Sequence, residues 1–236
     1  MTFDGVQRTD GRGLATLWQR GLPITGGWRV NNSLGVLSTP SIDLTRSQTG
    51  FYLPSTPVTG VSSEWRNARG IAFNAGAGEP GVFDGIRLPV FDGLSGSVAT
   101  AGAQFSPSPG WLTGAQVATA NNVPLGFGPL VSNERISATS WFGGAAWQGV
   151  NARVQGNLVG SRSRPEVNSG PDQNERLGGW IDAFIQDGRV GHSFGAFRFD
   201  PDMVWGSQLK QARCAHRVSH RRLASVPRVV VDRPRG

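Results

Sequence analysis

Strict alternation of apolar and polar residues is the feature that most constrains how this chain can fold. It is clearest in VNARVQGNL, Val150–Leu158, where every second residue is apolar or glycine. Successive side chains of a β-strand point to opposite sides of the sheet, so this stretch is predicted to be a strand between an apolar and a wet environment. The apolar face is Val150, Ala152, Val154, Gly156 and Leu158, and the wet face is Asn151, Arg153, Gln155 and Asn157.

The same pattern continues on either side of short turns. SGSVATAGAQF and WLTGAQVAT flank the turn SPSPG, and LGGWIDAFIQ and RVGHSFGAFRF flank Asp187-Gly188. Asp-Gly supplies the positive φ angles that a two-residue hairpin turn requires. The polar stretch SRSRPEVNSGPDQNER separates two of these strands and is predicted to be a long loop. GLATLWQRG, near Gly13, fits either a helical turn or a strand.

Short turns that alternate with longer polar loops are typical of transmembrane β-barrels, whose two rims differ in this way. The apolar faces consist of small residues with Trp or Phe near the strand ends, which suits a lipid-facing band closed by aromatic girdles. We therefore predict an all-β fold, an antiparallel meander of hairpins that forms part of a transmembrane barrel. A soluble β-sandwich with one wet face is the alternative. The residues predicted to face the lumen are Asn151, Arg153, Gln155 and Asn157, and those predicted for the girdle are Trp111, Trp141 and Trp147.

The C-terminal tail, Lys210–Gly236, differs from the rest of the chain in composition. Of the 23 Lys and Arg and the 16 Asp and Glu, the tail holds eight and one, which leaves 15 of each before Lys210. The net charge of +7 is therefore a property of the tail. It is rich in Arg, contains the single Cys and lacks sustained alternation, so it is predicted to be out of frame and disordered. A basic arm that binds nucleic acid through charge is the alternative.

No group of residues predicts catalysis, a cofactor or a metal site. GAGEPG, Gly76–Gly81, has the spacing of a dinucleotide-binding loop, but no amphipathic helix follows it, so a Gly/Pro-rich turn is predicted. Asp172, Asn174 and Glu175 lack the ligand spacing of a calcium loop. His192 has no candidate nucleophile in register, so no catalytic triad is predicted. The chain is predicted not to be an enzyme.

Three stretches resemble a known family. They are GEPGVFDGIRLP (Gly78–Pro89), LTRSQTGFYLP (Leu44–Pro54) and GAFRFDPDMVWGSQL. Together with the strand pattern over Gly27–Leu209, they resemble outer-membrane barrel proteins of Gram-negative bacteria, most of all the ushers that assemble fimbriae. Ushers are much longer, with a plug and periplasmic domains, so the resemblance implies a fragment of such a barrel. It implies secretion or assembly of fimbrial subunits, with membrane lipid, pilin subunits and a periplasmic chaperone as partners.

The sequence predicts three regions: a poorly defined N-terminal segment (1–27), a partial outer-membrane barrel (28–209) and the basic tail (210–236). Met1–Gly27 has no apolar segment behind a basic start, so no signal peptide is predicted, and the chain is expected to be a piece of a longer outer-membrane protein. The alternatives are a passive porin-like channel, a soluble secreted binding domain, and nucleic-acid binding by the tail. The favoured prediction, a fragment of an outer-membrane barrel, includes no nucleic-acid partner.

Overall fold

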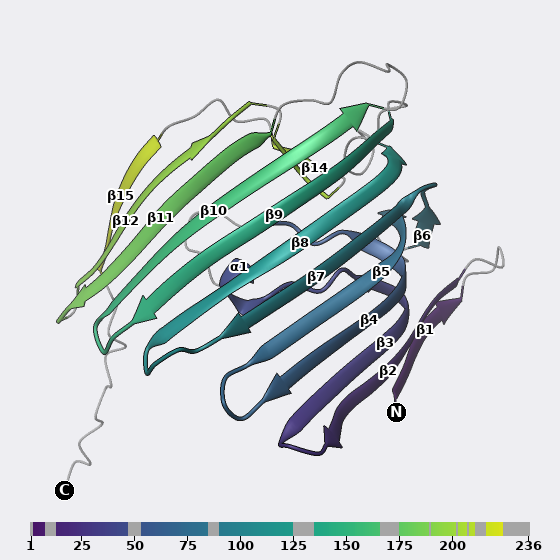
Figure 1. Cartoon of the computed structure of the whole chain (residues 1–236), viewed down its shortest axis with the longest axis horizontal. Coiled ribbons are helices and arrows are strands. Elements are labelled where there is room, and N and C mark those ends of the chain that lie inside the picture. The colour runs from purple at the N-terminus through teal and green to yellow at the C-terminus, as the bar shows by residue number, and fades with distance from the viewer. Residues whose placement is uncertain are drawn as a thin grey trace, which may run out of the picture.

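The computed structural model is dominated by one antiparallel sheet of 13 strands (Figure 1). The structure describes residues 2–7, 13–46, 53–84, 90–124, 135–165, 175–188, 190–201, 203–206, 208–210 and 216–223. The strand order is β1-β2-β3-β4-β5-β7-β8-β9-β10-β11-β12-β15, with β6 paired to β5 beside this path, and β13 and β14 form a separate pair. The predicted all-β antiparallel meander is confirmed. The elements are β1 Thr2–Gln7, β2 Gly13–Ile24, β3 Trp28–Ser38, α1 Asp43–Arg46, β4 Pro57–Asn67, β5 Ala72–Asp84, β6 Val90–Gly93, β7 Ser97–Phe105, β8 Trp111–Pro124, β9 Arg135–Gln148, β10 Ala152–Pro165, β11 Arg176–Asp187, β12 Val190–Phe199, β13 Met203–Trp205, β14 Gln208–Lys210 and β15 His216–Leu223.

The two ends of the strands are connected differently. Short turns join β2 to β3, β4 to β5, β7 to β8, β9 to β10 and β11 to β12, all at the end that lies toward the lower left of Figure 1, which we call the short-turn rim. At the opposite end, the long-loop rim, the connections after β3, β5, β8 and β10 are longer, and only the connection from β1 to β2 is as short as the turns. In the turn between β2 and β3, Gly26 and Gly27 have φ angles of 82° and 77°, which a residue with a Cβ rarely adopts. The predicted alternation of short turns and long connections is confirmed.

The sheet has two different faces. Residues 39–46 and 53–56, between β3 and β4, lie against one face together with β13, and we call this the inner face. Figure 1 shows α1 lying across the sheet on this side. A hydrophobic core forms here, where Leu44 and Met203 are fully buried against Phe142 and Trp180. The opposite, outer face is not covered by another described element.

The GAGEPG stretch, Gly76–Gly81, is not a turn but part of strand β5, so the turn prediction is wrong. Gly78 pairs with Gly60 of β4, and a Cβ on Gly60 would lie 2.0 Å from the backbone oxygen of Ala77. The glycines therefore allow two strand backbones to approach each other closely. The sequence alone does not show the pairing of β4 with β5, and without that pairing a glycine-rich stretch is predicted to be a turn.

Two local predictions are also resolved. GLATLWQRG forms a strand, since it lies within β2, which pairs with β3. The hairpin around Asp187-Gly188 is confirmed, although Asp187 still pairs with Val190, so the turn begins at Gly188, whose φ angle is 55°.

Both ends of the chain contribute strands to the sheet. β1 pairs with β2, so the N-terminal segment is continuous with the sheet. In the tail, β15 pairs with β12 from Phe197↔His216 to Val190↔Leu223, which differs from the expectation that the sheet ends near Leu209. Because an open strand edge offers backbone N–H and C=O groups to any extended chain, this pairing does not depend on side-chain alternation. Apart from β15 and Lys210, the tail lies outside the described residues.

Helical structure is limited to α1, Asp43–Arg46. In the part of the chain that the structure describes, no helix has the length and apolar character needed to cross a membrane.

Candidate functional site

The predicted wet-face residues of β10 lie mostly together on the inner face. Gln155 is 2% exposed, and its Nε2 donates to the backbone oxygen of Leu44 at 2.8 Å and to Oδ1 of Asn157 at 3.0 Å. Arg153 donates to Oε1 of Gln155 at 2.7 Å. Asn151 is not part of this group, because it lies in the exposed bend before β10. A lumen for these residues stays a prediction, since β1 and β15 do not pair with each other in the described sheet.

Residues Thr39–Thr56 form what we call the inner segment, described at 39–46 and 53–56. Its two ends are held together, because the Thr39 N–H donates to the Thr56 oxygen at 2.9 Å and the Thr56 N–H donates to Oγ1 of Thr39 at 2.9 Å. Gln116 of β8 binds the inner segment from the inner face of the sheet. Its Oε1 accepts from the Ile42 N–H at 3.1 Å, and its Nε2 donates to the Pro40 oxygen at 3.1 Å. Side chains of the sheet thus provide hydrogen-bond partners for backbone groups of the inner segment that are not paired in a strand or helix.

A charged cluster fixes the start of α1 against the inner face of the sheet. Both oxygens of the Asp43 carboxylate accept from the Arg66 guanidinium, at 2.7 and 2.9 Å. Gln104 donates to Asp43 at 2.6 Å and accepts from its backbone N–H at 2.6 Å. The hydrogen bonds from Arg66, followed by that from Gln104, hold the pKa of Asp43 below its ordinary value, although partial burial opposes this shift. Arg46 lies 3.4 Å from Glu64 on β4.

The inner segment fills only part of the inner face. Toward β7–β12 it packs closely, with Ile42 against Gly102 and Gly114, where a Cβ would meet the Ile42 side chain at 2.8 and 3.1 Å. Toward β2–β4 it leaves a hollow of about 1050 Å³, whose lining includes serines, Arg46 and Glu64. The inner face therefore combines a packed core with an open polar hollow.

From β3 to β11 the outer face carries a band without charged side chains. On β12 the exposed Arg198, which pairs with Gly179 at the level of Leu158, interrupts this band. On β10 the band runs over Ala152–Gly160, in which Leu158 is 63% exposed and Val154 is 37% exposed. Beyond it the outer positions are Arg162 and Arg164. A transmembrane β-strand needs about 9–11 residues, which matches the length of this stretch. Large exposed apolar patches on a protein surface indicate contact with a partner or a membrane.

Aromatic side chains border this band at the short-turn rim. Trp65 pairs with Phe73 across β4 and β5, and Trp111 pairs with Trp147 across β8 and β9, with Phe105 between them on β7. All five are between 37% and 50% exposed. The row shifts toward the short-turn rim from β4 to β9, as expected for strands that tilt within a membrane. Sequence reasoning found two of these residues and missed the other three, because the register that aligns them was unknown.

The three Trp predicted for the girdle do not form one row. Trp111 and Trp147 lie together, but Trp141 lies six positions from Trp147 along β9, about 20 Å at the rise of a β-strand. A Cβ on Gly160 would lie 2.4 Å from the Trp141 indole, so that ring lies over the neighbouring strand. Its Nε1 donates to Glu175 at 3.0 Å. Trp141 therefore lies at the opposite border of the band, and its place in a membrane girdle stays a prediction.

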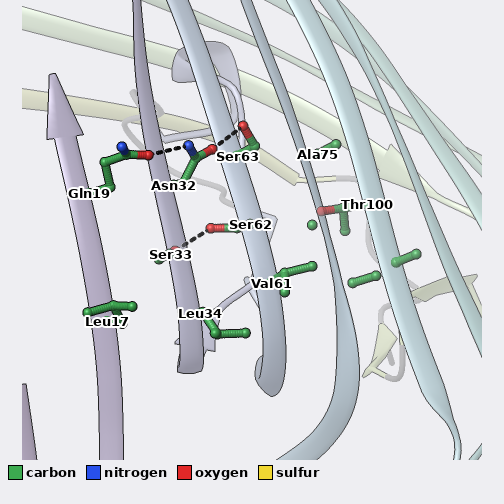
Figure 2. Close-up of a pocket in the computed structure, with 13 residues that line it drawn as sticks. Leu17, Gln19, Asn32, Ser33, Leu34, Val61, Ser62, Ser63, Ala75 and Thr100 are labelled. Carbon is green, nitrogen blue, oxygen red and sulfur yellow. Dashed lines mark hydrogen bonds between the residues drawn. The ribbon is translucent and has the colours of Figure 1, made fainter. Parts of the chain in front are cut away.

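The polar outer side chains of β2–β4 satisfy one another. Figure 2 shows Asn32 donating to Gln19 at 2.8 Å and accepting from Ser63 at 2.7 Å. Trp65 donates to the Ser63 hydroxyl at 2.8 Å. They border a hollow of about 650 Å³ that includes Leu34. Mutual hydrogen bonding lets these groups lie on an apolar face without the cost of unpaired polar atoms.

Among the described residues, no group of three or more His, Cys, Asp or Glu side chains could hold a metal ion. Of the three residues weighed as a cation site, only Glu175 is described, and it binds Trp141. Asp172 and Asn174 lie outside the described residues. His192 stacks on Phe194, with ring centroids 6.3 Å apart.

Comparison of this chain with protein-family models, with curated proteins and with solved structures finds no match.

Proposed function

We propose that this chain forms part of the wall of an outer-membrane β-barrel through which material crosses the membrane. The observation that carries the proposal is the difference between the two faces. The outer face has an uncharged band over β3–β11 that is bordered by aromatic residues, whereas the inner face binds a folded segment through buried Gln side chains. A soluble sandwich would bury its large apolar side chains between sheets, and here Leu34, Val61 and Leu158 are all more than half exposed.

The particular transport that we propose is secretion and assembly of fimbrial subunits, on the strength of the sequence resemblance to ushers. Pilin subunits and a periplasmic chaperone would then be the partners. A membrane location requires the outer edges of β1 and β15 to be paired by further strands, because lipid cannot satisfy their backbone groups.

A passive porin-like channel is the second candidate. The hollow beside the inner segment favours it, because serine hydroxyls together with Arg46 and Glu64 offer hydrogen bonds and both signs of charge to a small polar solute.

Flotation of the full chain with lipid vesicles tests the membrane proposal. The wild type should float with the vesicles, and Leu158→Arg should weaken this association by about 1–2 kcal/mol, because the cost of Arg on a lipid-facing strand is about 2–4 kcal/mol at the middle of the bilayer and falls toward its borders. Val150→Arg is the matched control, because Val150 lies in a turn and is fully exposed, so it should float like the wild type. Equal flotation of both variants, or recovery of the wild type in the soluble fraction, would contradict the proposal.

A further inference from the structure

The polar hollow on the inner face lies between two parts of the chain, the inner segment and the inner face of β2, β3 and β4. Trp18, Ser33 and Ser62 follow one another across these strands, because Trp18 pairs with Ser33 and Ser33 pairs with Ser62. Neighbouring strands lie about 4.8 Å apart, so this row spans about 10 Å. The volume of about 1050 Å³ is close to the upper end of the range for small-molecule sites, about 300–1,000 Å³.

Trp18 gives this hollow a flat apolar surface. Its side chain lines the hollow and is half-buried. The guanidinium of Arg20 lies 5.1 Å from the centre of the Trp18 ring, and Arg20 is not part of the lining, so it holds the indole from outside the hollow. Leu37 and Leu53 add apolar surface to the lining. An indole held in this way is a preformed surface on which a ligand ring can stack.

Arg46 and Glu64 supply polar groups to the same hollow. Glu64 lies on β4, two strands from Trp18, and its Oε1 accepts from Arg46 at 3.4 Å. The Ser41 hydroxyl accepts from Nε of Arg46 at 2.8 Å and so holds the guanidinium in place. A guanidinium has five N–H donors, and these two contacts leave others for a ligand. The side chains of Arg46 and Glu64 are 49% and 27% exposed, so a ligand can reach both.

We propose that this hollow binds a neutral oligosaccharide, an inference that rests on the porin-like candidate function and names its solute. A sugar ring has an apolar C–H face, which stacks on Trp18, and hydroxyl groups at its edge, which both donate and accept hydrogen bonds. Arg46 donates to these hydroxyls and Glu64 accepts from them. The ligand is neutral because the opposite charges of Arg46 and Glu64 offset each other.

Titration calorimetry with maltotriose tests the site on the full chain in detergent micelles. The wild type should bind maltotriose in a saturable way. Trp18→Ala should weaken this binding about five- to tenfold because the stacking surface is lost, whereas Trp18→Phe, which keeps a ring, should stay within about threefold of the wild type. Glu64→Gln should weaken it about fivefold, because a hydrogen bond to a charged acceptor becomes one to a neutral acceptor. Far-UV circular dichroism verifies that each variant keeps its β-structure.

Trp111→Ala is the matched control, because it removes an indole that is 45% exposed on the outer face. It should bind maltotriose like the wild type. The absence of saturable binding by the wild type, or equal weakening in Trp18→Ala and Trp111→Ala, would overturn the site. Saturable binding of glycine in place of maltotriose would overturn the sugar as its ligand in favour of a zwitterion.

Swelling of lipid vesicles that contain the full chain, placed in maltotriose solution, tests the channel separately. Binding together with swelling would support both the site and the porin-like function. Binding without swelling would contradict the porin-like function and still support the site. Swelling without binding would overturn the site alone.

Discussion

Asp43 shows how one carboxylate can hold the inner segment to the wall. It accepts from Arg66 at 2.7 and 2.9 Å and from Gln104 at 2.6 Å. Asp43→Asn should lower the free energy of unfolding by about 1 kcal/mol, since both partners are more than a third exposed and solvent screens the pair. Urea denaturation in detergent micelles measures this change. Glu79→Gln, on an exposed residue of β5, is the control and should have no effect.

The pH dependence of that difference follows from the pKa of Asp43. Because the folded-state pKa lies below the ordinary value of 3.8, the carboxylate stabilises the fold at pH values above 3.8. This stabilisation is lost as the pH falls through the lowered folded-state pKa. The urea midpoints of wild type and Asp43→Asn should therefore differ at pH 6 and converge in strong acid. A difference that stays constant down to about pH 2 would mean that the ion pair does not cause it.

At the scale of elements, the pairing of β4 with β5 depends on the absence of side chains. Gly60→Ala would place a Cβ 2.0 Å from the Ala77 oxygen, so the strands must move apart. We expect a loss of about 1–3 kcal/mol in the free energy of unfolding, the range for overpacking. Gly156→Ala is the matched control, because it is also a strand glycine and no atom lies within 4 Å of its added Cβ. Unfolding at the same urea concentration for the two variants would contradict this account.

Strands could be predicted where a single stretch carries the alternation, as in β10. Gln155 and Asn157 then fall on the same face whatever the neighbouring strand is. The inner segment could not be predicted in this way, because its contacts join Leu44 to Gln155 and Ile42 to Gln116, which are far apart in the sequence. Long-range hydrogen bonds of this kind leave no local periodic signal.

Features that depend on register were likewise beyond a single sequence. Trp65, Phe73 and Phe105 belong to the aromatic row only because β4, β5 and β7 pair as they do. GAGEPG was misassigned for the same reason, since the close approach of Gly60 and Gly78 explains its glycines.

For the whole molecule, the sequence predicted the class of fold and the different lengths of the connections at the two rims. It did not predict that the tail would contribute β15, because backbone pairing at an open edge needs no particular side chains. The sheet that results is open, with β1 and β15 at its two edges in the described structure. The proposal of a barrel wall therefore depends on what the two faces contact.

A quenching profile along β10 tests most directly whether the outer face contacts lipid. Single Cys residues at 154, 155, 156, 157 and 158, each with Cys214→Ser, carry a small fluorophore in the full chain reconstituted in vesicles of brominated lipid. Because Val154, Gly156 and Leu158 lie on the outer face and Gln155 and Asn157 on the inner face, quenching should alternate with a period of two. It should be strong at 154, 156 and 158 and weak at 155 and 157. Uniform quenching, or strong quenching at 155 and 157 only, would contradict the assignment of the outer face to lipid.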